Sequence, residues 1–270
     1  MTEETPEKKK ITWRTFNNPY WCELLSVLLL AAIGIFFDVS YAPQLLVSLL
    51  TTLLLDLAIN RVRGRTFYLS KSAAISGLLI GSILHSVPLY IFVFAGAAAI
   101  FSKHLVTIKN STAFNPAAVG ILLSVLLFSV SDTWWSSGQK IPVIILGLLV
   151  AWKISKLRLS LSFLMASFIL AFLWALPFQG LTPANLQSSF NSLPLFLAFF
   201  MLTEPKTTPF RKQHFWGPLF ALAVFALSLG GFPSAWLGGL LLGNLLYALH
   251  KVLAFPLKKP GGVRHKGGQT

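Results

Sequence analysis

Ten apolar runs, separated by short polar connections, account for most of this 270-residue sequence. Most of them approach the ~20 residues that an α-helix needs to cross the hydrocarbon core of a bilayer. Only 11% of the residues are charged, whereas a soluble domain carries about a quarter, so most of the surface cannot face water. We therefore expect an all-α polytopic membrane protein of about ten transmembrane helices. The runs lie near 21–37, 42–59, 72–86, 88–102, 115–131, 141–153, 160–177, 192–203, 215–230 and 234–250.

The positive charges alternate between the connections in a way that tests this count. If the chain crosses the membrane ten times, successive connections lie on alternate sides. Of the 22 Lys and Arg residues, 21 then lie in the terminal segments and connections of one side, and only Lys140 lies on the opposite side. Because Lys and Arg accumulate in cytoplasmic loops, this pattern predicts that both termini are cytoplasmic. The other clusters are Lys8, Lys9, Lys10 and Arg14; Arg61, Arg63, Arg65 and Lys71; Lys103 and Lys109; Lys153, Lys156 and Arg158; Lys206, Arg211 and Lys212; and Lys251, Lys258, Lys259, Arg264 and Lys266.

The connections are too short for a second domain. We expect a cytoplasmic N-terminal segment over residues 1–20, a single transmembrane domain over 21–253 and a basic cytoplasmic tail over 254–270. The first apolar run ends at Asp38 without a small-residue cleavage site, so we interpret it as a retained first helix. The basic residues form no stripe interleaved with aromatics, which argues against nucleic acid as a partner. The tail is either a solvated end or a contact for anionic lipid.

Cysteine and histidine limit the redox chemistry available to the chain. Cys22 is the single cysteine, which excludes a disulfide and a Cys-x-x-Cys site within the chain. The five histidines lie in or next to predicted loops. We therefore expect no haem, iron–sulfur cluster or metal site in this chain, so an electron carrier here would be organic.

A weak internal similarity suggests a five-plus-five repeat, with halves over about 21–131 and 141–250. Five helices are an odd number, so the second half would be inverted, as in several transporter folds. Short apolar stretches at Ser72–Leu84 and Leu193–Leu202 then correspond, which points to a ligand site; the alternative is that the second simply starts in a polar loop. An offset of 117 aligns Pro88 with Pro205, Pro116 with Pro233 and Ala118 with Ala235, which 15 prolines and many alanines could also produce by coincidence.

Two segments differ from ordinary apolar helix sequence. Phe114-Asn115-Pro116-Ala117-Ala118 begins the fifth run, where Asn followed by Pro is good helix-capping chemistry. An anion site at the same helix start is the alternative, and the residues alone favour the cap. Phe200-Met201-Leu202-Thr203-Glu204-Pro205-Lys206-Thr207-Thr208-Pro209 ends the eighth run, and Glu204 in it is either a solvated surface carboxylate or part of a site.

Smaller features have a packing interpretation beside a functional one. Gly77-x-x-x-Gly81 and Gly239-x-x-x-Gly243 allow close approach of helices, within the chain or between copies. Glu23 and Asp56 lie near the inner ends of the first two runs, where we expect them to pair with Arg61 or Lys71 rather than to relay protons.

Together, the two segments resemble the RnfD/NqrB family, the membrane subunits of Rnf complexes and of sodium-translocating NADH:quinone oxidoreductases. The resemblance rests on Phe114-Asn115-Pro116-Ala117-Ala118 and on Thr203-Glu204-Pro205-Lys206-Thr207-Thr208-Pro209, with Glu204 where the family has aspartate. It extends over most of the chain, which is shorter than typical members. It implies ten helices in a urea-transporter-like inverted repeat within a plasma membrane of bacterial type.

The resemblance also implies a flavin mononucleotide (FMN) joined through its phosphate to a threonine. In Gln179-Gly180-Leu181-Thr182-Pro183, Gly180, Thr182 and Pro183 match the family's attachment motif. Gln179 replaces a serine and Leu181 an alanine, and no carboxylate precedes them within 174–178. The ordinary alternative for Thr182 is a turn residue before proline. The cofactor-binding residues that the resemblance implies are Thr182, Gly180, Phe114, Asn115, Pro116, Thr203, Glu204, Pro205 and Thr207.

Three functions fit the sequence. The first is a flavin-holding electron-transfer subunit of an Rnf/Nqr-like ion-translocating complex, with flavin and iron–sulfur subunits and the lipid bilayer as partners. Such a subunit would not be catalytic alone. The second is a flavinless channel or transporter for a small solute on the same fold, and the third is a membrane scaffold.

Overall fold

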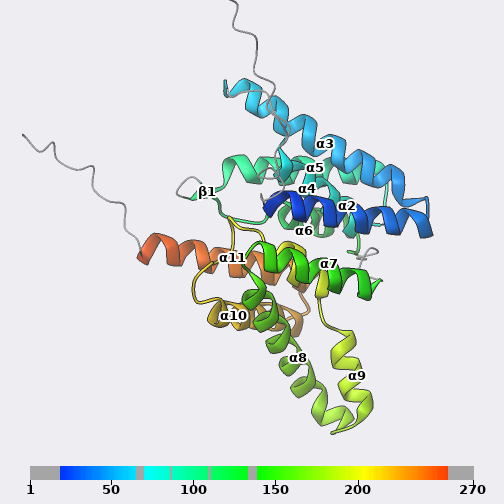
Figure 1. Cartoon of the computed structure of the whole chain (residues 1–270), viewed down its shortest axis with the longest axis vertical. Coiled ribbons are helices and arrows are strands. Elements are labelled where there is room, and N and C mark those ends of the chain that lie inside the picture. The colour runs from blue at the N-terminus through cyan, green and yellow to red at the C-terminus, as the bar shows by residue number, and fades with distance from the viewer. Residues whose placement is uncertain (1–18, 65–69, 86, 109–110, 133–138, 255–270) are drawn as a thin grey trace, which may run out of the picture.

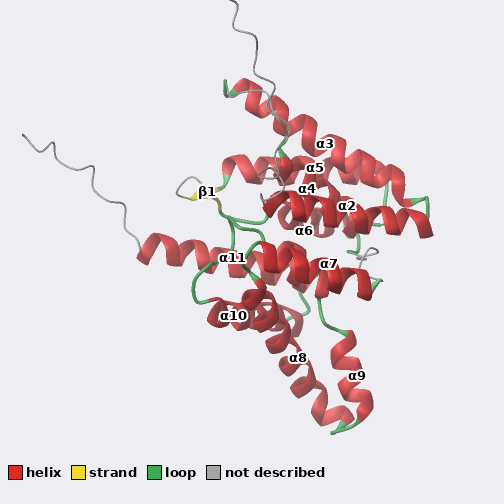
Figure 2. Ribbon diagram, viewed as in Figure 1, coloured by secondary structure: helices red, strands yellow, loops and turns green. Residues whose placement is uncertain are grey.

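The computed structural model describes residues 19–64, 70–85, 87–108, 111–132 and 139–254. Helices make up nearly all of this part (Figure 2). The predicted N-terminal segment, up to residue 18, and the predicted tail from residue 255 lie outside the described residues. The elements are α2 (Pro19–Phe37), α3 (Tyr41–Val62), α4 (Lys71–Ile83), α5 (Leu89–Leu105), β1 (Thr107–Ile108), β2 (Ser111–Thr112), α6 (Pro116–Phe128), α7 (Lys140–Lys153), α8 (Leu157–Gln179), α9 (Pro183–Asn191), η2 (Leu197–Met201), α10 (Gln213–Leu229) and α11 (Ala235–Ala254).

The helices are apolar and expose large apolar side chains, as helices in contact with lipid do. Among the described residues, four helices are long and apolar enough to cross a membrane, and several shorter ones are apolar as well. Large apolar side chains such as Phe36, Leu54 and Phe178 are 84%, 61% and 79% exposed, which suits a hydrocarbon environment. The chain is therefore a multi-pass all-α membrane protein, while the count of ten crossings stays a prediction. The four long spans are Tyr20–Phe37, Tyr41–Val62, Leu157–Gln179 and Ala235–Leu253.

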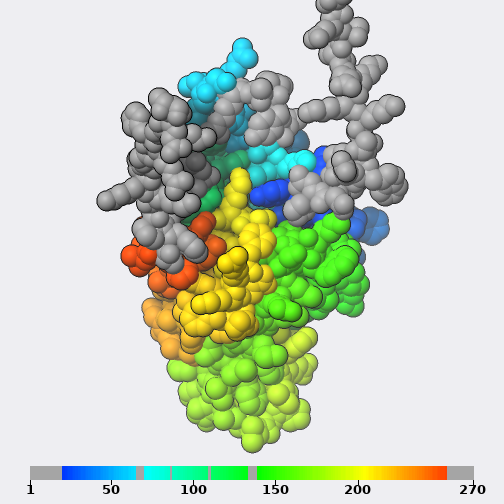
Figure 3. Space-filling model, turned by 60° about the vertical axis from the view of Figure 1, so that its left-hand side comes forward, coloured from blue at the N-terminus to red at the C-terminus, as the bar shows by residue number. Residues whose placement is uncertain are grey.

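The helices pack in two groups that follow the order of the chain (Figure 1). In the first group α3 packs against α4 and α5, α5 packs against α6, and α2 packs against α4. In the second group α10 packs against α8 and α11, and η2 packs against α7 and α8. The groups meet where α2 contacts α7 and where α6 contacts α11. The segment leading from η2 to α10 (yellow in Figure 3) lies on the surface between the two groups.

A buried polar stripe on α3 holds the first group together. The Ser48 hydroxyl donates to the carbonyl oxygen of Gly77 at 2.8 Å, and the Gln44 amide donates to that of Gly81 at 3.3 Å. A side chain at Gly77 would lie 2.8 Å from the backbone Cα of Leu49, so only glycine permits this approach. The glycine pattern in α4 therefore serves packing within the chain. The stripe comprises Gln44, Ser48, Thr52, Asp56 and Asn60.

The expected partners of Asp56 were wrong. Its carboxylate lies 3.0 Å from the Lys103 ammonium and 2.8 Å from His104 Nε2 on α5, rather than beside Arg61 or Lys71. Lys71 instead lies over the ring of Trp21, 4.4 Å from its centroid. The cause is tertiary, because α5 brings its last turn against α3, a contact that sequence proximity does not reveal.

The eighth apolar run, 192–203, forms less helix than the sequence suggested. Within it the structure has a single turn of π-helix, η2, preceded by a break at Pro194. A separate short helix, α9, precedes the break, and its polar sequence gave no apolar run to predict it. Irregular backbone at membrane depth must be buried in protein or line a cavity. Leu197 to Met201 are all buried, so the π-helical turn is enclosed by the rest of the chain, whereas Leu193 and Pro194 at the break are only half-buried.

Candidate functional site

The two unusual sequence segments meet in the structure. Asn115 caps α6, because its side-chain oxygen accepts from the backbone N–H of Ala118 at 3.1 Å, and Pro116 occupies the first turn. The predicted cap is therefore confirmed. The Asn115 side-chain nitrogen donates to the carbonyl oxygen of Met201 at 3.1 Å. One amide thus joins the start of α6 to the end of η2, 86 residues later in the chain.

Threonine hydroxyls fold the segment after η2 back on itself. Thr203 donates to the carbonyl oxygen of Phe199 at 2.7 Å, and Thr208 donates to that of Glu204 at 2.8 Å. Thr207 donates to the Glu204 carboxylate at 3.4 Å. Because Pro205 lacks an N–H, the helix cannot continue. The Thr203 and Thr208 hydroxyls therefore donate to carbonyl oxygens that would accept from backbone N–H groups in a continuous helix.

Asn244 of α11 completes this junction and was missed by the sequence reasoning. It is fully buried. With the amide oriented to suit its neighbours, its nitrogen donates to the Thr207 carbonyl oxygen at 3.2 Å and its oxygen accepts from the backbone N–H of Asn115 at 3.1 Å. A lone amide in the apolar sequence of α11 was the available signal, because a polar side chain inside a membrane helix needs a partner.

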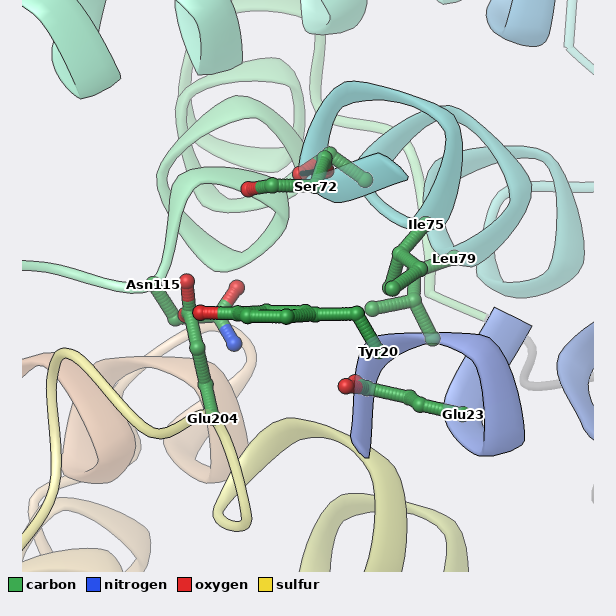
Figure 4. A pocket seen from close by; sticks show the side chains of 8 residues that line it. Tyr20, Glu23, Ser72, Ile75, Leu79, Asn115 and Glu204 are labelled. Atoms are coloured by element: carbon green, nitrogen blue, oxygen red, sulfur yellow. Dashed lines mark hydrogen bonds between the residues drawn. The ribbon is translucent and has the colours of Figure 1, made fainter. Parts of the chain in front are cut away.

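Two carboxylates face a small cavity at this junction (Figure 4). The cavity measures about 10 Å³, which is room for about one water molecule. Glu23 is buried, and among the described residues no Lys or Arg lies within 4 Å of its carboxylate. Figure 4 shows the ring of Tyr20 crossing the space beside Glu204. The lining residues are Tyr20, Glu23, Ser72, Ile75, Ser76, Leu79, Asn115 and Glu204.

Burial shifts the pKa of Glu204, which lines this cavity, and that of Lys156, which interacts with Glu204, in opposite directions. Desolvation raises the pKa of Glu204 to about 7, although the Lys206 ammonium and the hydrogen bond from Thr207 act to lower it. Desolvation likewise lowers the pKa of Lys156 to about 7, although Glu204 opposes that shift. Lys156, which begins α8, is fully buried and donates to the carbonyl and hydroxyl oxygens of Thr208 at 2.6 and 2.8 Å. Near neutral pH both groups can therefore gain or lose a proton.

Thr182 and Gly180 lie away from this junction. Thr182 caps α9, accepting from the backbone N–H of Asn185 at 3.2 Å and donating to the carbonyl oxygen of Gln179 at 3.0 Å. It is exposed, and Gly180 beside it has a φ of +63° with open space around it. Figure 1 places the turn between α8 and α9 at the far end of the molecule from β1 and from the end of α11.

The structure therefore separates the predicted site residues into two places. Asn115, Pro116, Thr203, Glu204, Pro205 and Thr207 meet at the junction, with the half-buried Phe114 just before the cap. Thr182 and Gly180 stand at the beginning of α9.

The comparison with protein families gives one match. A sequence model described as the NQR2, RnfD, RnfE family matches residues 10–141. The matched range contains the Asn115 cap and the whole first group of helices, whereas Glu204 and Thr182 lie beyond it. A search of curated proteins finds no match to the chain.

Proposed function

Because the chain belongs to the NQR2, RnfD, RnfE family, we propose that it is a flavin-holding electron-transfer subunit of an Rnf/Nqr-type ion-translocating complex. The family itself points to a membrane subunit that assembles with the other subunits of such a complex. The observation that carries the proposal is the junction between the two sequence motifs. Asn115 lies inside the matched range and bonds directly to the end of η2, outside it.

The surroundings of Thr182 suit a flavin attached through its phosphate. The hydroxyl is exposed at the N-terminus of α9, where backbone N–H groups and the helix dipole favour an anion. Gly180 leaves open space beside it. A bound flavin would supply the one- and two-electron chemistry, while the protein would hold its phosphate and set its position.

In this proposal the junction between the two sequence motifs is structural and does not hold the flavin ring. Its cavity of about 10 Å³ has no room for a flavin ring system in this conformation. Phe114, Asn115, Pro116, Thr203, Glu204, Pro205 and Thr207 would thus form the broken-helix core between the halves rather than hold the flavin ring.

We also propose that the fold is the urea-transporter-like inverted repeat. The packing partners support this, because α3 with α5 and α5 with α6 in the first group correspond to α8 with α10 and α10 with α11 in the second. The groups meet through corresponding helices, α2 with α7 and α6 with α11. Such pairing is what a pseudo-two-fold axis between the halves produces.

A flavinless channel or transporter is the second candidate. The acidic cavity favours it, because ionisable side chains among packed membrane helices are costly unless they have a function, and here Glu23 is buried and Glu204 half-buried. Glu23 and Glu204 come from opposite groups of helices and line the same space. In such a protein this cavity would widen to pass a small cation or polar solute.

A denaturing gel separates the two candidates. We expect flavin fluorescence on the band of the protein purified after co-expression with a flavin transferase, because a phosphoester survives denaturation. Thr182→Ala should abolish the fluorescence. Ser188→Ala, which removes a hydroxyl one helix turn or more further along α9, should keep it. A native protein without any flavin, bound covalently or not, would remove the electron-carrier proposal and leave the channel.

A further inference from the structure

A second, larger pocket lies apart from both places described above. It measures about 210 Å³, against about 10 Å³ for the acidic cavity, and shares no residue with it. It opens where α7 begins, where the chain breaks between α9 and η2, and where α11 begins. Its walls are Lys140, Asn191, Ser192, Leu193, Pro194, Leu195, Phe196 and Trp236.

The pocket has a positive charge on one wall. The Lys140 ammonium donates to the side-chain oxygen of Asn191 at 2.8 Å. Among the residues the structure describes, no carboxylate lies within 4 Å of it. A neutral amide leaves the charge uncompensated, and an ammonium has three N–H donors. Lys140 is also the one Lys or Arg that the charge pattern assigns to the outer side, so its presence there is not explained by membrane topology.

Apart from Ser192, the remaining walls are apolar, and a second cavity adjoins them. Leu193, Pro194, Leu195, Phe196 and Trp236 face the pocket. A neighbouring cavity of about 50 Å³ shares Ser192 and Trp236 with it and continues between α8 and α10.

The floor of that chamber carries a polar atom without a partner. The Ser167 hydroxyl is buried and, among the described residues, makes no hydrogen bond. Buried hydroxyls are normally hydrogen-bonded. The space thus combines a charged mouth with an apolar interior that has one unsatisfied polar group.

We propose that this pocket binds an amphipathic anion, with a phosphate or carboxylate head against Lys140 and a short acyl chain or ring against Trp236 and Phe196. The site is separate from Thr182, because Thr182 caps the start of α9 and the pocket residue Asn191 ends it, nine residues later and about 13 Å along the helix. The proposal does not depend on a flavin. The same chemistry fits a lipid head group from the outer leaflet or a soluble anion.

Octyl phosphate is the test ligand, added below its micelle concentration to the full-length protein in a non-ionic detergent. We expect it to raise the melting midpoint of the native protein. Its dissociation constant should be at least tenfold higher for Lys140→Gln than for the native protein. The matched control is Lys153→Gln, at the opposite end of α7, which should bind as the native protein does. Inorganic phosphate and octyl glucoside should each bind at least tenfold more weakly, since one lacks the chain and the other the charge.

A second variant guards against loss of folding in the first. Asn191→Asp keeps the lysine but places a carboxylate beside it. This variant should also weaken the binding of octyl phosphate at least tenfold. Unchanged binding in both variants, or equal binding of octyl glucoside, would overturn the proposal. Native mass spectrometry then identifies the source: a phospholipid that is retained by the native protein and lost from Lys140→Gln indicates lipid, and its absence from both indicates a soluble anion.

Discussion

Lys156 shows how far a single residue departs from what its sequence position suggests. The charge pattern of the sequence predicts that it is one of the solvated cations of an inner loop, beside Lys153. In the structure Lys153 is exposed, whereas Lys156 is fully buried, bonded to Thr208 and 4.0 Å from the centre of the Phe210 ring. Charge counting could predict the side of the membrane but not burial, because burial depends on a loop 52 residues away.

Replacing Lys156 should therefore destabilise the segment after η2. Lys156→Met leaves the carbonyl oxygen of Thr208 buried without its donor, which costs about 1–3 kcal/mol. Lys153→Met, an exposed change in the same connection, should stay within about 0.5 kcal/mol. Unfolding in mixed detergent micelles measures both. Equal effects of the two variants would mean that the Lys156 bonds contribute nothing specific.

Glu204 gives a prediction about pH. Desolvation raises its pKa in the folded protein to about 7, from an ordinary value of 4.5. The folded state therefore holds the proton more tightly than the unfolded state, and stability falls as pH rises from about 4.5 to about 7. Glu204→Gln removes this loss, so its melting midpoint should exceed that of the native protein by an amount that grows from pH 5 to 7 and then levels off.

The control for this measurement is an exposed carboxyl. Hydrogen bonds from Ser40 hold the pKa of Asp38 below its usual value. Asp38→Asn should therefore show no growing difference between pH 5 and 7. A difference for Glu204→Gln that stays constant over this range would contradict the raised pKa of the half-buried Glu204.

At the scale of elements, apolar length predicted the helices and local polar chemistry predicted their ends. The Asn115 cap followed from Asn before Pro. Thr182 before Pro183 carries the same signal and caps α9, yet the only structural alternative that we drew from the sequence there was a turn residue before proline. Glu23 and Glu204 could not be paired from the sequence, since their meeting requires α2 to contact the chain after η2 across the two groups.

The contact between α3 and α4 offers a prediction at this scale. Gly77→Ala places a methyl group 2.8 Å from the Cα of Leu49 and 2.9 Å from the Ser48 carbonyl oxygen, so the helices must separate. We expect a loss of about 1–3 kcal/mol, as for overpacked cores. Gly230→Ala is the matched control, since its nearest neighbour would lie 3.6 Å away. Thermal unfolding of the two variants compares them, and an equally stable Gly77→Ala would show that the approach is looser than described.

At the scale of the whole molecule, one charge pattern connects topology with function. Among the described residues, the cationic last turns of α3, α5 and α11 lie on the left-hand side of Figure 1, away from the turn that carries Thr182. We therefore predict that the junction near Glu204 opens toward the cytoplasm and that Thr182 faces the outside. The sequence predicted this threading from charge alone, whereas the bonds between the two groups of helices came only from the structure.

Labelling with a membrane-impermeant maleimide on intact cells tests this arrangement most directly. In a Cys22→Ser background, Leu181→Cys and Val62→Cys provide single thiols at positions 84% and 88% exposed. We predict that Leu181→Cys reacts on intact cells and that Val62→Cys reacts only after the membrane is permeabilised. Labelling of Val62→Cys on intact cells, with Leu181→Cys protected until permeabilisation, would contradict the threading and the outward position of Thr182.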